Sequence, residues 1–62
     1  MCELSVYTVA GGKRVMVMEG VVRMVPRDGK VILEGILGEA KEVPGILSEV
    51  NIIAQEANIE SK

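Results

Sequence analysis

Alternating polar and apolar residues in the first third of the chain predict a β-hairpin. Over residues 3–9, Leu4 and Val6 share one face of an extended segment and polar residues take the other, as in a half-buried strand. The Ala-Gly-Gly sequence at 10–12 supplies residues that readily adopt the positive φ of a tight reversal. We expect residues 13–19 to return as the partner strand.

Short runs of β-branched residues, separated by glycine-bearing turns, continue beyond this hairpin. The runs cover residues 21–25 and 30–34, and a short polar run follows at 39–43. Gly20 starts or bends the first of them, and the Pro-Arg-Asp-Gly sequence at 26–29 is a strong turn signal. Gly35 and Gly38 bracket a bulge or corner, and Pro44-Gly45 turns the chain again.

The last third of the chain fits two kinds of secondary structure. The apolar residues of 46–53 recur at helical spacing, whereas their β-branched side chains favour a strand. No serine, threonine or aspartate caps a helix just before this segment, and we favour the strand. A brief closing strand is expected over 57–60, within a mostly polar stretch at 54–62 that otherwise forms a loose end.

Turns at intervals of roughly 8–12 residues are typical of a small all-β sandwich or barrel. The 62 residues are expected to form a single domain, 1–62. So short a chain is near the lower size limit for folding alone, because it buries only roughly 60% of the surface that its unfolded form exposes. We therefore expect a second copy to contribute, as a homodimer.

The composition limits which side chains can fill the core and which classes of partner the chain can bind. Hydrophobic residues make up 48% of the chain, but it has no Trp or Phe and only one Tyr, so aliphatic residues and four methionines must fill the core. A net charge of −2 argues against a protein that mainly holds phosphates, so nucleic acid is not an expected partner. No signal peptide or long apolar run is visible, which indicates a reduced, cytoplasmic protein without a membrane segment.

The absence of histidine removes catalytic triads, His-based acid–base catalysis and imidazole metal sites. The only cysteine is Cys2, directly after Met1. Its thiolate is a soft ligand, and an adjacent amine or amide nitrogen completes an N,S chelate that suits nickel, copper or zinc. The nitrogen comes from the Met1 amine and the Cys2 amide if Met1 is kept, or from the Cys2 amine if it is removed. Position alone is equally consistent with an inert cysteine.

Several short stretches follow one another along nearly the whole chain: Met1-Cys2-Glu3, Val6-Tyr7, Val17-Met18-Glu19 with Val21-Val22, Ile36-Leu37-Gly38-Glu39 and Val43-Pro44-Gly45-Ile46. In this order they resemble the CooT-type small nickel-binding proteins. The resemblance implies a homodimeric β-barrel of about six or seven short antiparallel strands. It also implies an accessory protein without catalysis, which supplies nickel for the maturation of carbon monoxide dehydrogenase, with Cys2 as the nickel ligand.

One chain offers too few donors around Cys2 for a saturated four-coordinate metal site. We therefore expect two Cys2 thiolates, with backbone nitrogen donors that include Met1, to hold one Ni(II) across a twofold axis. Tetragonal N and S coordination favours nickel or copper over zinc, and affinity order alone favours copper. The choice of nickel therefore rests on the resemblance.

Other residues with reactive side chains have simpler explanations. We expect Glu3 to be a solvated carboxylate rather than an outer ligand, and Tyr7 to be a buried aromatic residue. Met16, Met18 and Met24 are better explained by packing in the core or an interface than by a thioether site.

Two other functions fit a small β-protein. A module that binds RNA would need a basic side, formed from Lys13, Arg14, Arg23, Arg27 and Lys30. Acidic residues alternate with these cations, which favours a solvated surface instead. A hydrogenase-assembly chaperone also begins Met-Cys, but usually has a proline soon after, and residues 3–6 contain none.

Overall fold

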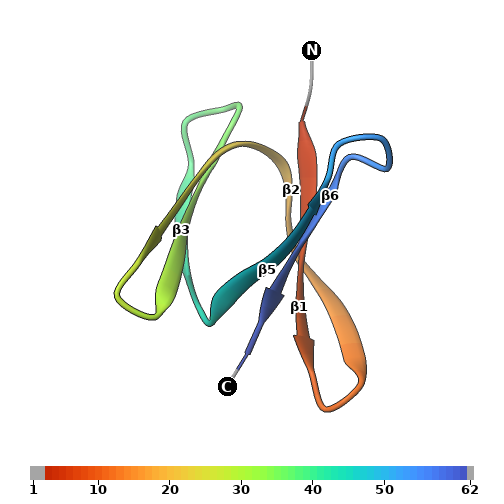
Figure 1. Cartoon of the computed structure of the whole chain (residues 1–62). Helices are drawn as coiled ribbons and strands as arrows, with labels where there is room; N and C mark the ends of the chain where they lie inside the picture. The colour runs from red at the N-terminus through yellow and green to blue at the C-terminus, as the bar shows by residue number, and fades with distance from the viewer. Residues whose placement is uncertain (1–2, 62) are drawn as a thin grey trace.

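The computed structural model describes residues 3–61, which form six strands in one sheet (Figure 1). The strands are β1 (Leu4–Ala10), β2 (Lys13–Arg27), β3 (Lys30–Gly35), β4 (Ala40–Pro44), β5 (Ile46–Asn51) and β6 (Glu56–Glu60). Their order across the sheet is β4-β3-β2-β1-β6-β5. The all-β prediction is confirmed, and within residues 3–61 no helix has the length and apolar character needed to cross a membrane.

Two tight turns join the first three strands. Gly11 and Gly12 have φ values of 57° and 80°, and Asp28 and Gly29 have 52° and 77°. Two successive residues with positive φ match the right-handed twist of the flanking strands, which is why such turns dominate short hairpins. The predicted reversal at 10–12 is confirmed, and the second turn comprises only the last two residues of the predicted 26–29 segment.

The expected runs 13–19 and 21–25 belong to one 15-residue strand, β2. Gly20 bends this strand with a φ of 66°, and its carbonyl accepts a hydrogen bond from the Ile36 N–H at 2.9 Å. The register shifts on both sides of the bend, opposite β1 and opposite β3. The bend therefore lets the first half of β2 pair mainly with β1 and the second half with β3.

The C-terminal third forms a β-hairpin whose second strand lies inside the sheet. The strand expected over 46–53 is β5, and the closing strand expected over 57–60 is β6. Strand β6 begins one residue earlier than expected and lies between β1 and β5, so the closing strand is an interior strand of the sheet. It runs parallel to β1, in register from Ser5 with Glu56 to Val9 with Glu60. The prediction of purely antiparallel strands is therefore wrong for this pair.

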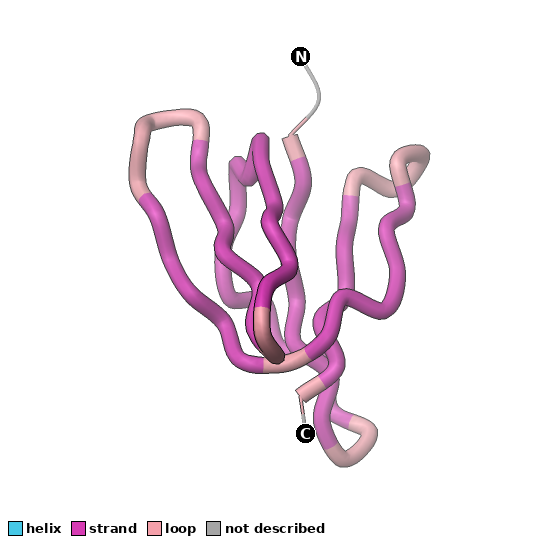
Figure 2. Tube along the Cα trace, turned by 60° about the vertical axis from the view of Figure 1, so that its left-hand side comes forward, coloured by secondary structure: helices cyan, strands magenta, loops and turns pink. Residues whose placement is uncertain are grey.

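The predicted barrel is also wrong, because the sheet is not closed. Its two edge strands, β4 and β5, are joined by Gly45 alone. A single residue leaves no room for the reversal that an antiparallel hairpin needs, so β5 leaves β4 at a corner and pairs with β6 instead. The Gly45 N–H donates to the Gly29 carbonyl at 2.9 Å, which ties the corner to the β2–β3 turn. Figure 2 shows the strongly curled sheet that results.

The core lies on the inner face of this curled sheet and is entirely aliphatic. Its buried members are Val6, Val21, Val31, Leu33, Val43, Ala57 and Ile59. Partly buried side chains around them include Met18 and Met24, as the packing interpretation predicted, whereas Met16 is 42% exposed. No polar or charged side chain is buried among the described residues. The small core therefore depends on each aliphatic side chain in it.

We expect Leu33→Ala to lower the free energy of unfolding by about 2–5 kcal/mol, because it leaves a cavity at a fully buried position. A chain of this length has roughly 3–9 kcal/mol in total, so the variant should be partly unfolded. Leu37→Ala is the matched control, since Leu37 is 88% exposed, and it should change stability little. Urea unfolding followed by circular dichroism measures both, and equal losses would contradict the described core.

We expect Gly45→Ala to destabilise the fold more than Gly11→Ala. A Cβ at residue 45 would lie 2.5 Å from the Glu60 carbonyl oxygen, where backbone must move, and the φ of 132° is strained for alanine. At Gly11 the same Cβ meets open space, so only the positive φ is penalised, by roughly 1–2 kcal/mol. Thermal melts of the two variants test the difference. A smaller drop in melting temperature for Gly45→Ala than for Gly11→Ala would contradict the close backbone packing described at Gly45.

Candidate functional site

The predicted metal ligands, Cys2 and Met1, lie outside the residues that the structure describes. The described chain starts at Glu3, directly before β1. Both ribbon views place this start at the same end of the molecule as the β3–β4 and β5–β6 turns (Figures 1 and 2). We call this end, residues 3–5, 19–20, 35–39 and 52–56, the amino-terminal rim.

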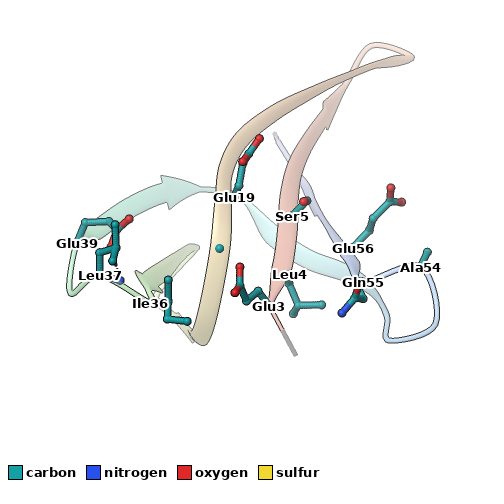
Figure 3. A pocket seen from close by; sticks show the side chains of 11 residues that line it. Glu3, Leu4, Ser5, Glu19, Ile36, Leu37, Glu39, Ala54, Gln55 and Glu56 are labelled. Atoms are coloured by element: carbon teal, nitrogen blue, oxygen red, sulfur yellow. Dashed lines mark hydrogen bonds between the residues drawn. The ribbon is translucent and has the colours of Figure 1, made fainter. Parts of the chain in front are cut away.

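A cavity of about 640 Å³ lies within the rim (Figure 3). Its lining comes from the start of β1, the bend of β2, and the two turns: Glu3, Leu4, Ser5, Glu19, Gly20, Ile36, Leu37, Glu39, Ala54, Gln55 and Glu56. Figure 3 shows the β3–β4 turn on one side and the β5–β6 turn on the other, with the start of β1 between them. Segments far apart in the sequence therefore meet around the point where β1 begins.

Among residues 3–61, four carboxylates and no lysine or arginine line this cavity. Glu56 forms an ion pair with Arg14 at 2.7 Å, and the Glu39 carboxylate accepts a hydrogen bond from the Leu37 N–H at 3.1 Å. Among residues 3–61, the ion pairs include neither Glu3 nor Glu19. The rim therefore carries a negative potential that only one cation partly offsets.

The rim carboxylates do not converge on a single point. No group of three or more Asp, Glu, Cys or His side chains in the described part of the chain is arranged to hold a metal ion. Glu3 is exposed, as expected for a solvated carboxylate, and the absence of a Cβ at Gly20 leaves room beside its Oε1. The described rim therefore supplies no carboxylate cage of its own.

Both rim turns are held by backbone hydrogen bonds. In the β3–β4 turn, the Gly35 N–H donates to the Glu39 carbonyl at 2.8 Å and the Gly38 N–H to the Gly35 carbonyl at 3.0 Å. The β5–β6 turn is joined to β1 by the Ser5 N–H, which donates to the Gln55 carbonyl at 2.9 Å. The shape of the rim is thus fixed by backbone hydrogen bonds within the β3–β4 turn and between β1 and the β5–β6 turn.

Tyr7 is half-buried and stacks against Arg14, whose guanidinium carbon lies 3.7 Å from the ring centroid. Arg14 also donates to Asn58 at 3.0 Å, so it joins β2 to β6 across β1. The stack gives Tyr7 a structural role, and its burial is only partial where the sequence predicted a buried aromatic residue.

The cations that an RNA-binding surface would need are largely paired with carboxylates. Besides Arg14, Arg23 contacts Glu34 at 2.7 Å and Lys30 contacts Glu42 at 3.3 Å. These exposed pairs follow the alternation of charge in the sequence. Because three of the five cations of the predicted basic side pair with carboxylates, the described surface offers no observation that favours nucleic acid.

Sequence reasoning singled out Glu3 but not the carboxylates that share its cavity. Glu19 directly precedes Gly20, which bends β2, and Glu39 directly follows Gly38 in the β3–β4 turn. Their position beside these glycines was the sequence feature that could have identified them. Glu56 had no such signal, because it reaches the rim only through the parallel pairing of β6 with β1.

The comparisons with known proteins identify the family. The family model described as CO dehydrogenase accessory protein CooT matches residues 1–60. The chain belongs to the CooT family. This match includes Met1 and Cys2, and it confirms the resemblance drawn from the sequence.

A solved structure supports the same fold for this CooT-family chain. The crystal structure of a protein described as "putative CooT" from Carboxydothermus hydrogenoformans superposes with a TM-score of 0.87. The two sequences are 24% identical, and the match covers 98% of each chain. At this identity the likeness shows a shared fold. A search of curated proteins finds no match to this sequence.

Proposed function

We propose that this CooT-family chain binds Ni(II) and supplies it for the maturation of a nickel enzyme such as carbon monoxide dehydrogenase. The observation that carries the proposal is the family match over residues 1–60, whose description names an accessory protein of CO dehydrogenase. The role is that of a carrier, without turnover of its own. We place it in the cytoplasm, where a thiol stays reduced.

The metal is held by the Cys2 thiolate and by backbone nitrogen, including that of Met1. The chain has a single cysteine and no histidine, so Cys2 is its only thiolate and no imidazole competes with it. Thiolate with amine or amide nitrogen suits nickel. The thioethers are poorer candidates, because Met18 and Met24 pack against the core.

Two copies share one nickel ion in this proposal. A twofold axis supplies a second thiolate and second nitrogens, which together complete a four-coordinate site. Self-association is supported by the small core and by strand β5, an unpaired sheet edge on which Ile46 and Val50 are exposed. Pairing along such an edge satisfies backbone groups and covers apolar side chains in one step.

We expect native mass spectrometry of the reduced protein to show one nickel per dimer, and Cys2→Ala to abolish nickel binding while the dimer persists. Met16→Leu is the matched control. Met16 is more exposed than Met18 and Met24, which pack against the core, so its thioether is the most accessible of the three. Removing it should leave nickel binding intact. Nickel retained by Cys2→Ala would refute the proposed ligand. Nickel bound at one ion per isolated monomer would refute the shared site.

We also expect nickel affinity to fall as pH falls. The thiol must lose its proton to bind the metal, so binding releases protons and becomes weaker when protons are abundant. Calorimetric titrations with nickel at pH 6 and pH 8, in buffers of different ionisation enthalpy, measure both the affinity and the protons released. Equal affinity at the two pH values, or no proton release, would contradict a thiolate ligand.

A further inference from the structure

The amino-terminal rim exposes large apolar side chains on both of its turns. Leu37 is 88% exposed in the β3–β4 turn, and Ile53 is 97% exposed in the β5–β6 turn. Ile36 and Ile52 beside them are also exposed. Figure 3 shows these two turns on opposite sides of the cavity. Single exposed apolar residues are ordinary, but such residues on two turns around one cavity mark a surface that another molecule covers.

The proposed nickel site determines which molecule covers the rim. Glu3 follows Cys2 directly, and consecutive Cα atoms lie about 3.8 Å apart, so the rim begins one residue from the proposed ligand. Two Cys2 thiolates can bind the same ion only if both chain starts approach the twofold axis. The rims of the two copies are thereby brought to that axis. A second copy of the chain is therefore the occupant that the shared site requires.

The rim also continues the sheet edge that supports self-association. Val50 is exposed near the end of β5, and Ile52 and Ile53 follow directly after the strand. These three residues form one exposed apolar run that leads from the edge of β5 into the rim. Both rim turns are fixed by backbone hydrogen bonds, so covering them requires little ordering of the surface.

The carboxylates of the rim oppose the same contact. Of the four that line the cavity, only Glu56 belongs to an ion pair of residues 3–61. Across a twofold axis each rim meets a copy of the same charges, and facing like charges disfavour association. Nickel does not offset them, because one Ni(II) that replaces two thiol protons leaves the net charge of the site unchanged. Its contribution to the dimer is therefore the bonds that it makes to both copies.

We propose that the two rims form the dimer interface, that their facing carboxylates keep the metal-free dimer weak, and that nickel binding and dimer formation are thereby coupled. This inference rests on the proposed function. An ion held by ligands of both copies binds the dimer better than the monomer, and it tightens the dimer by that difference. By the same linkage, separation of the copies releases the ion, since each copy alone keeps only half of the ligands. A carrier of this kind delivers its metal when its copies part.

Sedimentation equilibrium of the reduced protein tests the coupling. It measures the dimer dissociation constant without metal and with one equivalent of nickel per two chains. We expect nickel to tighten the wild-type dimer about tenfold or more. Cys2→Ala should keep the dissociation constant of the metal-free wild type and should not respond to nickel. An equal dissociation constant of the wild type with and without nickel would overturn the coupling.

The apolar turns have their own variants. Leu37→Ser combined with Ile53→Ser should weaken the metal-free dimer about tenfold or more, because both side chains lie in the proposed interface. Val15→Ser is the control, since Val15 is exposed near the β1–β2 turn, away from the rim, and should change the dissociation constant less than about twofold. Circular dichroism checks that each variant is folded. A dimer as tight as that of the wild type in the first variant would overturn the interface.

The charges predict an effect of opposite sign. Glu19→Gln with Glu39→Gln should tighten the metal-free dimer about fivefold or more at low salt, and glutamine keeps an oxygen that can accept the Leu37 N–H bond. Added sodium chloride should also tighten the wild-type dimer, because it screens the facing carboxylates. Asp28→Asn with Glu60→Gln is the matched control. It removes the same net charge from the β2–β3 turn and the end of β6, away from the rim, and should have less effect (Figure 1).

Two results of the charge experiment would overturn the proposal. Equal tightening by both pairs of variants would reduce the effect to net charge, and a wild-type dimer that weakens with added salt would show attraction between the copies instead of repulsion. Nickel titration of the same samples keeps the proposals distinguishable. One nickel per dimer, bound through Cys2 in a dimer that the rim variants leave unchanged, contradicts the interface alone. Nickel retained by Cys2→Ala contradicts the proposed function itself.

Discussion

The parallel pairing of β1 with β6 is the constraint on which the rest of the structure depends. Every other strand pair joins neighbours in the sequence, and only this pair brings the two ends of the chain together. The pairing places Val6 beside Ala57, and with Ile59 they form the part of the core contributed by these two strands. It also sets the β5–β6 turn beside the start of β1 and thereby forms one wall of the rim.

The corner at Gly45 determines how the chain gets from β4 to the position in which β6 pairs with β1. A one-residue connection cannot fold β5 back onto β4, so the chain crosses the open side of the sheet and returns as β6. The sheet curls around an aliphatic core but keeps two unpaired edges. An open edge with exposed Ile46 and Val50 is a site at which another strand can add, which links the topology to the proposed dimer.

The rim connects the fold to the proposed chemistry. Glu3, the residue after Cys2 in the sequence, lines a cavity together with three other carboxylates, and their negative field attracts cations. Among the described residues, these carboxylates are not grouped to hold a metal ion, which leaves the metal to the Cys2 thiolate and backbone nitrogen in our proposal.

The sequence by itself determined the strands, the hairpin turns and the chemistry of the chain start. Gly11-Gly12 and Asp28-Gly29 make their turns through local backbone preferences, and the single cysteine with no histidine is a fact of composition. Only the tertiary structure decided that β6 pairs in parallel with β1, that the barrel stays open at Gly45, and that Glu56 joins Glu3 at the rim. Alternating apolar residues specify that a strand has a buried face, but many partner strands satisfy that face equally, and the choice among them depends on the packing of the whole chain.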